Sequence, residues 1–477
     1  MTFYGISDIL KSNEKINNES CVIMKRLHFL FSLYVGKVIM KLTKWIPKIS
    51  GSTWPGGIAG ILMKNFLKHF RFHENTKIVM VTGTSGKTTT TGMVAELIRS
   101  SGKSICTNEL GANMDRGVAT ALIGDSDMSG RVNVDYVVLE VDERYLRIIT
   151  KQLKPDVIIM TNILKDQSQR NGEPGIIMRK IKEAVTSDVH LILNRDEPNN
   201  ASIGFKHPSV EYYGVKGSPS YKSENQFTVS CICPVCSGII RYEYENMLGV
   251  GKFACENCDM KSEDDATVVS LINENTICVN DKKFKAKYLS TYFLYCYASL
   301  IAFAAHEGFS DTELQNSMNK FTIQSGRTED LDIGDKMIHY LRMKQETPIT
   351  LQNSIDVTYN DPAAKVVVLD LSEVVDFQPH YTGNYYSYDC DFGKLEKSNV
   401  IKYICMSKTV CYDAATRLIL EGIPKDKIQV VPTDDYDVLL KELEQYDCKQ
   451  VYLLTWMHSY YKCLGSVEKY RKDRGID

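Results

Sequence analysis

Residues 77–90, KIVMVTGTSGKTTT, decide the fold. The apolar run from Lys77 to Val81 predicts a strand, and a helical stretch, Thr90 to Arg99, follows the loop. Small residues between a strand and a helix allow backbone N–H groups to surround a phosphate at the helix N-terminus. The first glycine is Gly83, whereas the general phosphate-loop pattern would place it at Val81. The strand–loop–helix context nevertheless predicts a nucleotide site.

Each polar group of this loop has a chemical task. The Lys87 ammonium can reach the β- and γ-phosphates, and the Thr88 hydroxyl can bind Mg²⁺. Glu140 ends the next expected strand, Tyr136 to Leu139, where Mg²⁺ needs a further oxygen ligand. The acidic run from Glu140 to Glu143 could otherwise be a solvated turn. The expected nucleotide-binding residues are Gly83, Thr84, Ser85, Gly86, Lys87, Thr88 and Thr89.

Four cysteines have the spacing of a zinc ribbon. Two C-x-x-C pairs are separated by eighteen residues, at Cys233, Cys236, Cys255 and Cys258. This spacing is typical of a four-thiolate Zn²⁺ site, in which two tight turns present four sulfurs with no open position. Such a closed site indicates a structural metal. The alternatives are a redox dithiol and a chance pattern.

Composition limits the class of protein. The chain has 477 residues, 43% of them hydrophobic, which fits a globular protein of about three domains. Its net charge of −2 argues against a nucleic-acid partner, since such proteins normally carry a basic surplus. Fourteen cysteines are scattered along the chain and no signal peptide is evident, so we expect a reducing cytoplasm.

The N-terminal stretch contains a basic, amphipathic segment. Its apolar part, Leu27 to Gly36, is too short to span a membrane, which takes about 20 residues. Helical spacing places four lysines on one face, Lys37, Lys41, Lys44 and Lys48, with the apolar residues elsewhere. Two interpretations remain open: a helix resting on an anionic membrane surface, or one packed on its own domain. Translation could start at Met1 or at Met24.

Strands and helices alternate from Lys77 to Asn200, which predicts a parallel sheet covered by helices. We expect an N-terminal extension with the basic helix at 1–58 and a central ATP-binding domain at 59–326. A zinc ribbon is expected as an insertion at 205–285. A second α/β domain, Rossmann-like, is expected at 327–477.

Further polar residues end the strands of the central domain. Asn162 ends one strand, and Asn194 to Asp196 end another, so that a crevice is expected at this edge of the sheet. Arg327 follows a glycine at the domain junction, where its guanidinium could stabilise a phosphate as charge develops. A lone interdomain arginine could equally be a salt-bridge partner.

These motifs resemble the Mur ligase family. The resemblance to its central domain rests on VTGTSGKTTT (81–90), EVDE (140–143), TNILKDQ (161–167) and LNRDEP (193–198). The DQ pair, the four-cysteine ribbon and the basic helix followed by Trp54-Pro55-Gly56 resemble one branch, the MurT-type subunits of lipid II isoglutaminyl synthase. The resemblance is clear over residues 24–330 and weaker beyond.

The resemblance implies an amidation. ATP would convert the α-carboxylate of D-glutamate in the lipid II stem peptide into an acyl phosphate, which ammonia attacks. A GatD-type class I glutamine amidotransferase would supply the ammonia. Asn194 and Asp196 would lie near the nucleotide, and Arg327 would stabilise the transferring phosphate. Asp389, with Asp376 and Asp391 as alternatives, would orient the histidine of the partner's Cys–His pair.

The C-terminal half departs from the branch. Tyr386 and Tyr388 stand where tryptophans are usual beside the aspartate, which leaves the acceptor substrate and the fit of the glutaminase open. Two other functions are therefore considered: a Mur-type ligase that adds an amino acid, and a nucleotide-binding regulatory or scaffold subunit without turnover. We expect a cytoplasmic protein, with peripheral contact at the inner face of the membrane as an option.

Overall fold

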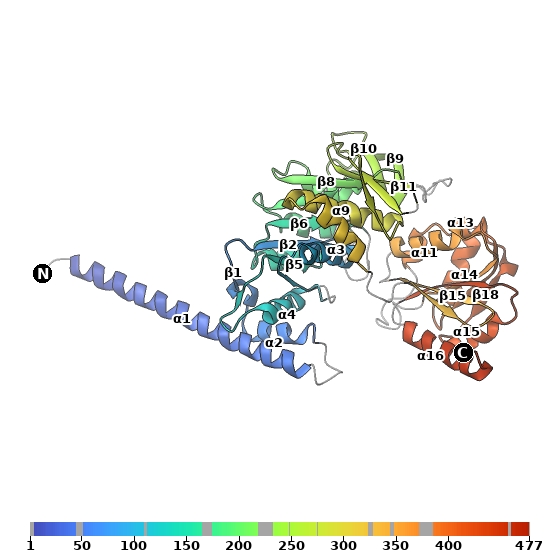
Figure 1. The fold of residues 1–477 in the computed structure, drawn as a ribbon, viewed down its shortest axis with the longest axis horizontal. Helices are drawn as coiled ribbons and strands as arrows, with labels where there is room; N and C mark the ends of the chain where they lie inside the picture. The colour runs from blue at the N-terminus through green and yellow to red at the C-terminus, as the bar shows by residue number, and fades with distance from the viewer. Residues whose placement is uncertain are drawn as a thin grey trace. The chain divides into compact units, whose positions relative to one another are not determined.

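The computed structural model describes residues 4–43, 51–108, 112–164, 174–217, 232–247, 249–273, 275–322, 328–343, 348–371, 385–456 and 459–476. The chain forms two compact units, one ending at Phe321 and one consisting mainly of Thr322–Asp477 (Figure 1). The change of unit falls close to the domain boundary expected at residue 327.

A nine-stranded sheet forms the centre of the first unit, in the order β13-β12-β11-β8-β7-β6-β2-β5-β3. The strands from β3 to β11 in this order are parallel, and β12 and β13 are antiparallel additions at one edge. Their bounds are β2 (Lys77–Thr82), β3 (Ile105–Thr107), β5 (Tyr136–Glu140), β6 (Val157–Met160), β7 (His190–Asn194), β8 (Val210–Val215), β11 (Thr267–Asn273), β12 (Thr276–Val279) and β13 (Lys282–Lys285).

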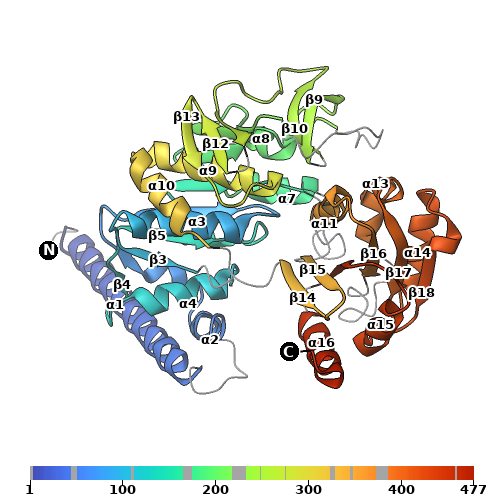
Figure 2. The same ribbon diagram turned by 45° about the vertical axis from the view of Figure 1, so that its right-hand side comes forward.

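Helices cover this sheet. α9 is apolar over most of its surface, and it packs on β7, β8 and β11. It also lies beside α3, which in turn contacts α10 (Figure 2). A reciprocal capping box between Ser310 and Glu313 begins α10. The bounds are α3 (Lys87–Ser100), α4 (Asp115–Asp125), α5 (Leu146–Thr150), α7 (Pro174–Lys182), α8 (Pro198–Gly204), α9 (Thr291–Glu307) and α10 (Asp311–Lys320).

The N-terminal helix α1 (Tyr4–Thr43) packs on its own unit, together with α2 (Trp54–Leu62) and α4. Phe29 and Leu33 are fully buried there. The Lys37 ammonium donates hydrogen bonds of 2.6 Å to the carbonyls of Ile123 and Ser126, at the C-terminal end of α4. A cation is stabilised at that end of a helix. Lys37 therefore points into the protein, while Lys44 and Lys48 lie outside the described residues.

Short segments complete this region of the first unit. A 3-10 helix, η1 (Phe66–His69), contacts α1, and β1 (Arg71–Phe72) pairs with β4 (Arg131–Val132) in a separate small sheet. Among the described residues no helix is both long enough and apolar enough to cross a membrane.

The cysteine-bearing module is smaller than the insertion expected at 205–285. It contains a two-stranded antiparallel sheet of β9 (Ile240–Met247) and β10 (Val250–Cys255). Within the expected range, β8 lies before the module and β11 to β13 after it, and all four join the nine-stranded sheet. A strand's length and pattern do not reveal which sheet it joins, so the sequence could not distinguish the strands of the cysteine module from those of the nine-stranded sheet.

The second unit has its own six-stranded sheet, in the order β14-β15-β19-β16-β17-β18, parallel except for β14. Apolar clusters on the two faces bury it between helices, as expected of a Rossmann-like domain. Its elements are β14 (Thr328–Asp332), β15 (Met337–Met343), α11 (Pro348–Asn360), β16 (Lys365–Asp370), η2 (Tyr385–Asp389), α13 (Gly393–Glu396), β17 (Val400–Met406), α14 (Cys411–Leu420), η3 (Lys425–Lys427), β18 (Ile428–Val431), α15 (Tyr436–Leu443), β19 (Gln450–Trp456) and α16 (Tyr460–Arg474).

Candidate active site

The loop between β2 and α3 depends on its two glycines. Gly83 has φ +126° and Gly86 has φ +93°, in the region that favours glycine over residues with a side chain. A Cβ on Gly83 would also collide with Thr161 and with the backbone of Asn162. The chain therefore turns tightly from the strand into the helix at this point.

Asn162, just beyond the end of β6, holds the loop in shape. Its Oδ1 accepts a 2.9 Å hydrogen bond from the Ser85 N–H, and its Nδ2 donates to the Ser85 carbonyl at 3.1 Å. The Asn162 carbonyl accepts from the Thr84 N–H at 2.8 Å. The loop is thus ordered by the protein itself, before any phosphate binds.

Lys87 begins α3 and is buried in an ion pair. Its Nζ lies 2.9 Å from Glu143 Oε2, and the two side chains are only 9% and 3% exposed. Burial favours the neutral amine, but the nearby carboxylates, above all Glu143, outweigh it and raise the pKa of Lys87 above its ordinary value. The ammonium is therefore charged and held at the loop. The role of Glu143 was not predicted, because an acidic run gives no sign of which member faces the lysine.

Glu140, the last residue of β5, offers an oxygen that fits a metal ion. The side chain is fully buried, and Oε1 accepts a 2.9 Å hydrogen bond from Asn113 Nδ2. Oε2 is buried without a hydrogen-bond partner in the described part of the chain. A buried carboxylate oxygen normally has a partner, and carboxylate oxygen is a preferred Mg²⁺ ligand. Thr88, the second residue of α3, is half-buried.

Asn108 fixes the position of Glu140. Its Nδ2 donates to the Glu140 carbonyl at 2.8 Å, and its Oδ1 accepts from the Glu140 N–H at 2.7 Å. Asn108 and Asn113 belong to one segment, so the two amides together position the carboxylate. Neither was predicted as a site residue, although both belong to the stretch Asn108 to Met114, which also resembles the family.

Asn194 is the last residue of β7 and Asp196 follows the strand, and both side chains are engaged within the protein. Asn194 Nδ2 donates to the Thr161 carbonyl at 3.1 Å. Asp196 is fully buried, and its Oδ2 accepts from the Val215 N–H at 2.8 Å and from the Tyr295 hydroxyl at 2.9 Å. Burial raises the pKa of Asp196 despite these donors. Both residues therefore hold the ends of β6, β7 and β8 together.

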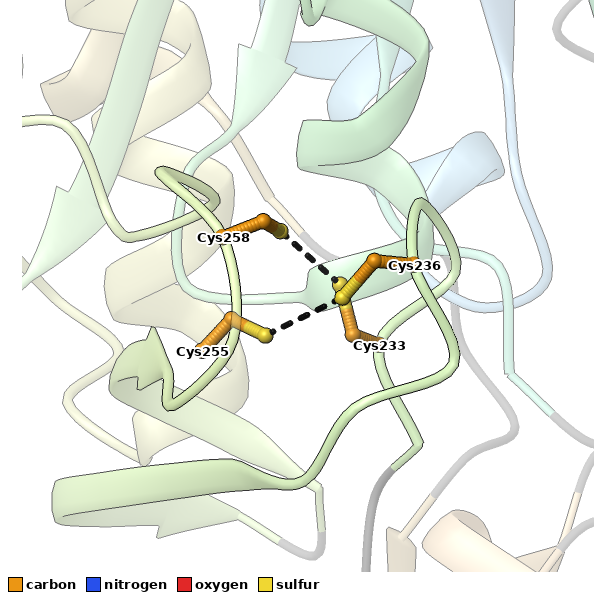
Figure 3. A group of neighbouring side chains, drawn as sticks. All are labelled: Cys233, Cys236, Cys255 and Cys258. Carbon is orange, nitrogen blue, oxygen red and sulfur yellow. Dashed lines mark hydrogen bonds between the residues drawn. The ribbon is translucent and has the colours of Figure 1, made fainter.

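The four predicted cysteines come together (Figure 3). The Cys233 and Cys258 sulfurs are 3.8 Å apart, and those of Cys236 and Cys255 are 3.5 Å apart. Tetrahedral Zn²⁺ with Zn–S bonds of 2.3 Å requires sulfurs about 3.8 Å apart. The hydrogen bond from the Asn257 N–H is the largest influence that lowers the pKa of the Cys255 thiol, to about 7. The arrangement fits a closed zinc site.

The ribbon is attached to residues at the C-terminal ends of β7 and β8. The Gly251 N–H donates to the Asp196 carbonyl at 2.8 Å. Asn246 Nδ2 donates to the Val215 carbonyl and to the Tyr295 hydroxyl, both at 2.9 Å. Asp196, Val215 and Tyr295 thus link the ribbon to β7, β8 and α9.

In the second unit, Asp389 ends the short helix η2 and is half-exposed. The buried Arg417 of α14 fixes this turn: its Nη2 donates to the Cys390 carbonyl at 2.7 Å and its Nε to the Ser387 carbonyl at 3.2 Å. Asp391 lies two residues further, with its N–H bonded to Gln352 at 2.7 Å. The two other predicted residues, Arg327 and Asp376, lie outside the described residues.

Comparison with known proteins identifies the family. The Mur ligase middle domain matches residues 81–257, and the MurT ligase C-terminal domain matches residues 345–458. The chain belongs to the Mur ligase family, in its MurT branch. The first match includes Lys87 and Glu140, and the second includes Asp389.

Curated relatives of this MurT-type chain agree. It is 28% identical, over 89% of its length and 94% of the relative's, to the lipid II isoglutaminyl synthase (glutamine-hydrolyzing) subunit MurT of Streptococcus pneumoniae. It is 25% identical to the subunit of the same name from Staphylococcus aureus, over 87% of this chain and 92% of the relative. Among solved structures, a pseudomurein peptide ligase type C from Methanothermus fervidus has the same fold, with a TM-score of 0.64 and 19% identity over 83% of this chain and 79% of the other.

Proposed function

We propose that this chain is the synthetase subunit of a lipid II isoglutaminyl synthase. It transfers the γ-phosphoryl group of ATP to the α-carboxylate of D-glutamate in the stem peptide, which gives an acyl phosphate and ADP. Ammonia then attacks the acyl carbon, so that the C–N bond forms as phosphate leaves. The observation that carries this proposal is the charged, buried Lys87 at the phosphate loop, next to a Glu140 oxygen without a partner among the described residues.

The residues of the loop share the work of phosphoryl transfer, which is mostly positioning and charge neutralisation. The backbone N–H groups of the loop and Lys87 would bind the phosphates, and Thr88 and Glu140 would hold Mg²⁺. Mg²⁺ neutralises the developing charge on the phosphate oxygens when it is bound. When phosphate approaches, Lys87 exchanges Glu143 for it. We assign Arg327 to the transferring phosphate on the family resemblance alone.

We further propose that a glutaminase supplies the ammonia and that Asp389 orients the histidine of its Cys–His pair. The rigid turn formed by Arg417 and η2 would hold Asp389 at a fixed position. Apolar side chains are exposed on the same pair of contacting elements: Tyr388 on η2, and Tyr412 and Leu420 on α14. Exposed aromatic residues are typical of protein–protein contact surfaces.

The lipid-linked substrate places the enzyme at a membrane surface, and α1 offers a contact. Apolar side chains recur every three or four residues on its outer face, and each is between 44% and 68% exposed: Met24, Leu27, Phe31, Tyr34, Val38 and Leu42. Lys25 and Lys41 are exposed on the same helix. An apolar stripe with lysines beside it suits the interface of an anionic bilayer. We propose that this stripe, rather than the Lys37 face, lies on the inner surface of the membrane.

The decisive experiment uses the purified chain with Mg-ATP, ammonium chloride and lipid II that carries D-glutamate. High ammonia replaces the glutaminase. We expect carboxamide in the stem peptide by mass spectrometry, with one ADP released for each amide formed. ADP release that requires an amino acid in place of ammonia would indicate the other class of Mur ligase. Nucleotide binding without any turnover would indicate a regulatory or scaffold subunit.

The role of Asp389 is tested in the complex with the glutaminase. Asp389→Asn should lower glutamine-dependent amidation by about 100-fold or more, because the partner's histidine loses its orienting carboxylate. Amidation from ammonium chloride should be unchanged. Asp413→Asn, an exposed acid on α14, is the matched control. Equal loss with both nitrogen sources would contradict the role.

A further inference from the structure

Three metal-ligating side chains meet in the first unit, away from the phosphate loop. His190 is the first residue of β7, Glu211 is the second residue of β8, and His306 lies in the last turn of α9. One donor atom of each lies within 4.8 Å of the others. The phosphate loop follows the C-terminal end of β2, whereas these residues sit at the N-terminal ends of β7 and β8, the opposite edge of the parallel strands.

The pairing of the strands brings the side chains together. Glu211 pairs with Ile192, two residues after His190, so that His190 and Glu211 project from the same face of the sheet. α9 packs on β7 and β8 and adds His306. The two imidazole rings are stacked, with their centroids 3.8 Å apart and an interplanar angle of 12°, so one ring has to turn for the in-plane lone pairs of both to meet at one ion.

The donor distances fit a small metal ion. Glu211 Oε1 lies 3.0 Å from His306 Nδ1 and 3.5 Å from His190 Nε2. Tetrahedral Zn²⁺, with bonds of about 2.0–2.1 Å to nitrogen and oxygen, separates its ligand atoms by about 3.3 Å. The two observed distances lie on either side of this value.

His190 shows the clearest sign of a missing ligand. Its Nε2 is buried and has no hydrogen-bond partner within the described part of the chain. Its other nitrogen, Nδ1, lies 2.8 Å from Ser209 Oγ. When the Nδ1–H donates this hydrogen bond to Ser209, Nε2 carries a lone pair, and Nε2 lies 3.5 Å from Glu211 Oε1. Metal-bound histidines are normally oriented by a hydrogen bond from the second nitrogen in this way.

We propose that His190, Glu211 and His306 form a second metal site, which takes a zinc-class divalent transition ion. Two imidazoles and one carboxylate leave the fourth position for water. The site belongs to three elements, β7, β8 and α9, and its ligands are 21 and 95 residues apart in sequence. The bound ion would therefore hold the last turn of α9 to the N-terminal ends of β7 and β8. It is independent of the four cysteines and takes no part in the proposed amidation.

The test titrates the full chain, with its cysteine site already loaded, with Zn²⁺ and with Co²⁺. We expect one further equivalent to bind, a rise in melting temperature, and a Co²⁺ spectrum without thiolate charge-transfer bands. His190→Gln, Glu211→Gln and His306→Gln should each weaken binding by at least about tenfold. His207→Gln is the matched control, because this nearby histidine contributes no donor to the cluster.

The outcomes separate the alternatives. The site is supported if the three variants lose the further equivalent of metal and His207→Gln still binds it. Absence of a further equivalent in the unmodified chain overturns it and leaves a hydrogen-bonded trio. If all three variants bind the further equivalent as the unmodified chain does, the ion binds elsewhere, and this result also overturns the proposed site. Circular dichroism and melting of metal-free His306→Gln, a partly exposed position, show whether a loss reflects misfolding.

Discussion

The phosphate loop and the cysteine ribbon each have residues suited to a ligand, but they differ in the protein contacts that hold them when no ligand is bound. In the loop, Lys87 has Glu143 as a partner and Ser85 has Asn162. In the ribbon, the four sulfurs contact one another and accept hydrogen bonds from the N–H groups of Gly238 and Asn257. The loop supports its own geometry, whereas we expect the ribbon to depend on a bound metal. Loss of ligand should therefore affect stability far more at the ribbon.

The largest effect is expected at Lys87. Lys87→Met should reduce ADP formation by about a thousandfold or more, since phosphoryl transfer depends on charge neutralisation. It should also lower stability, because Glu143 is left as a buried carboxylate without its cation. ADP release and urea unfolding measure the two effects.

A second variant separates these effects. Lys87→Met combined with Glu143→Gln removes the unpaired charge, so it should recover much of the lost stability but none of the activity. Recovery of activity in the double variant would show that Lys87 acts only as a partner of Glu143. The loop would then not be the catalytic site.

The next effect concerns the ribbon. Cys255→Ser should release zinc, lower the melting temperature by several degrees and leave the rate per folded molecule within about threefold, because a closed zinc site contributes to folding and does no chemistry. Cys278→Ser, on β12 and outside the cluster, is the control. An unchanged melting temperature with an abolished rate would reverse the comparison between the two sites.

The smallest effect is expected at Tyr295, whose hydroxyl connects the ribbon to the residues that follow β7. Tyr295→Phe removes the hydroxyl that bonds Asp196 and Asn246, and we expect a loss of about 1–2 kcal/mol in the free energy of unfolding. Tyr212→Phe is the control, since its hydroxyl has no hydrogen bond within the described residues. If both variants lose the same stability, the Tyr295 hydroxyl does not hold the ribbon to the residue that follows β7.

Local pattern predicted most of the individual elements. The strands expected at Lys77 to Val81 and at Tyr136 to Leu139 are found as β2 and β5, each one residue longer, because each is a regular apolar pattern between polar or turn-forming residues. The helix after the loop begins at Lys87 rather than at Thr90, because the loop's last residues already form its first turn. The partners of β8 and β11 were not predictable, since pairing depends on contacts distant in sequence.

In the candidate site, too, local motifs were predictable and contacts between residues distant in sequence were not. The loop and the four cysteines are contiguous or closely spaced motifs, and the sequence predicted both. The pairing of Lys87 with Glu143 joins residues 56 positions apart, and no local pattern signals it. Asn194 and Asp196 were placed by resemblance near the nucleotide, and that role stays a prediction, because their described partners are all within the protein.

The outermost strand of the large sheet has a consequence for the behaviour of the protein at high concentration. Within the described residues β12 is the strand that pairs with β13, and on the outer side of β13 the Gln315 side chain of α10 bonds the N–H and the carbonyl of Lys285. Three of its four residues are exposed lysines, and the fourth, Phe284, is buried. Like charges on an edge strand repel the same strand of another molecule. Replacing Lys283 and Lys285 with threonine should make the protein more prone to aggregate, while Lys282 keeps its ion pair with Asp311 of α10.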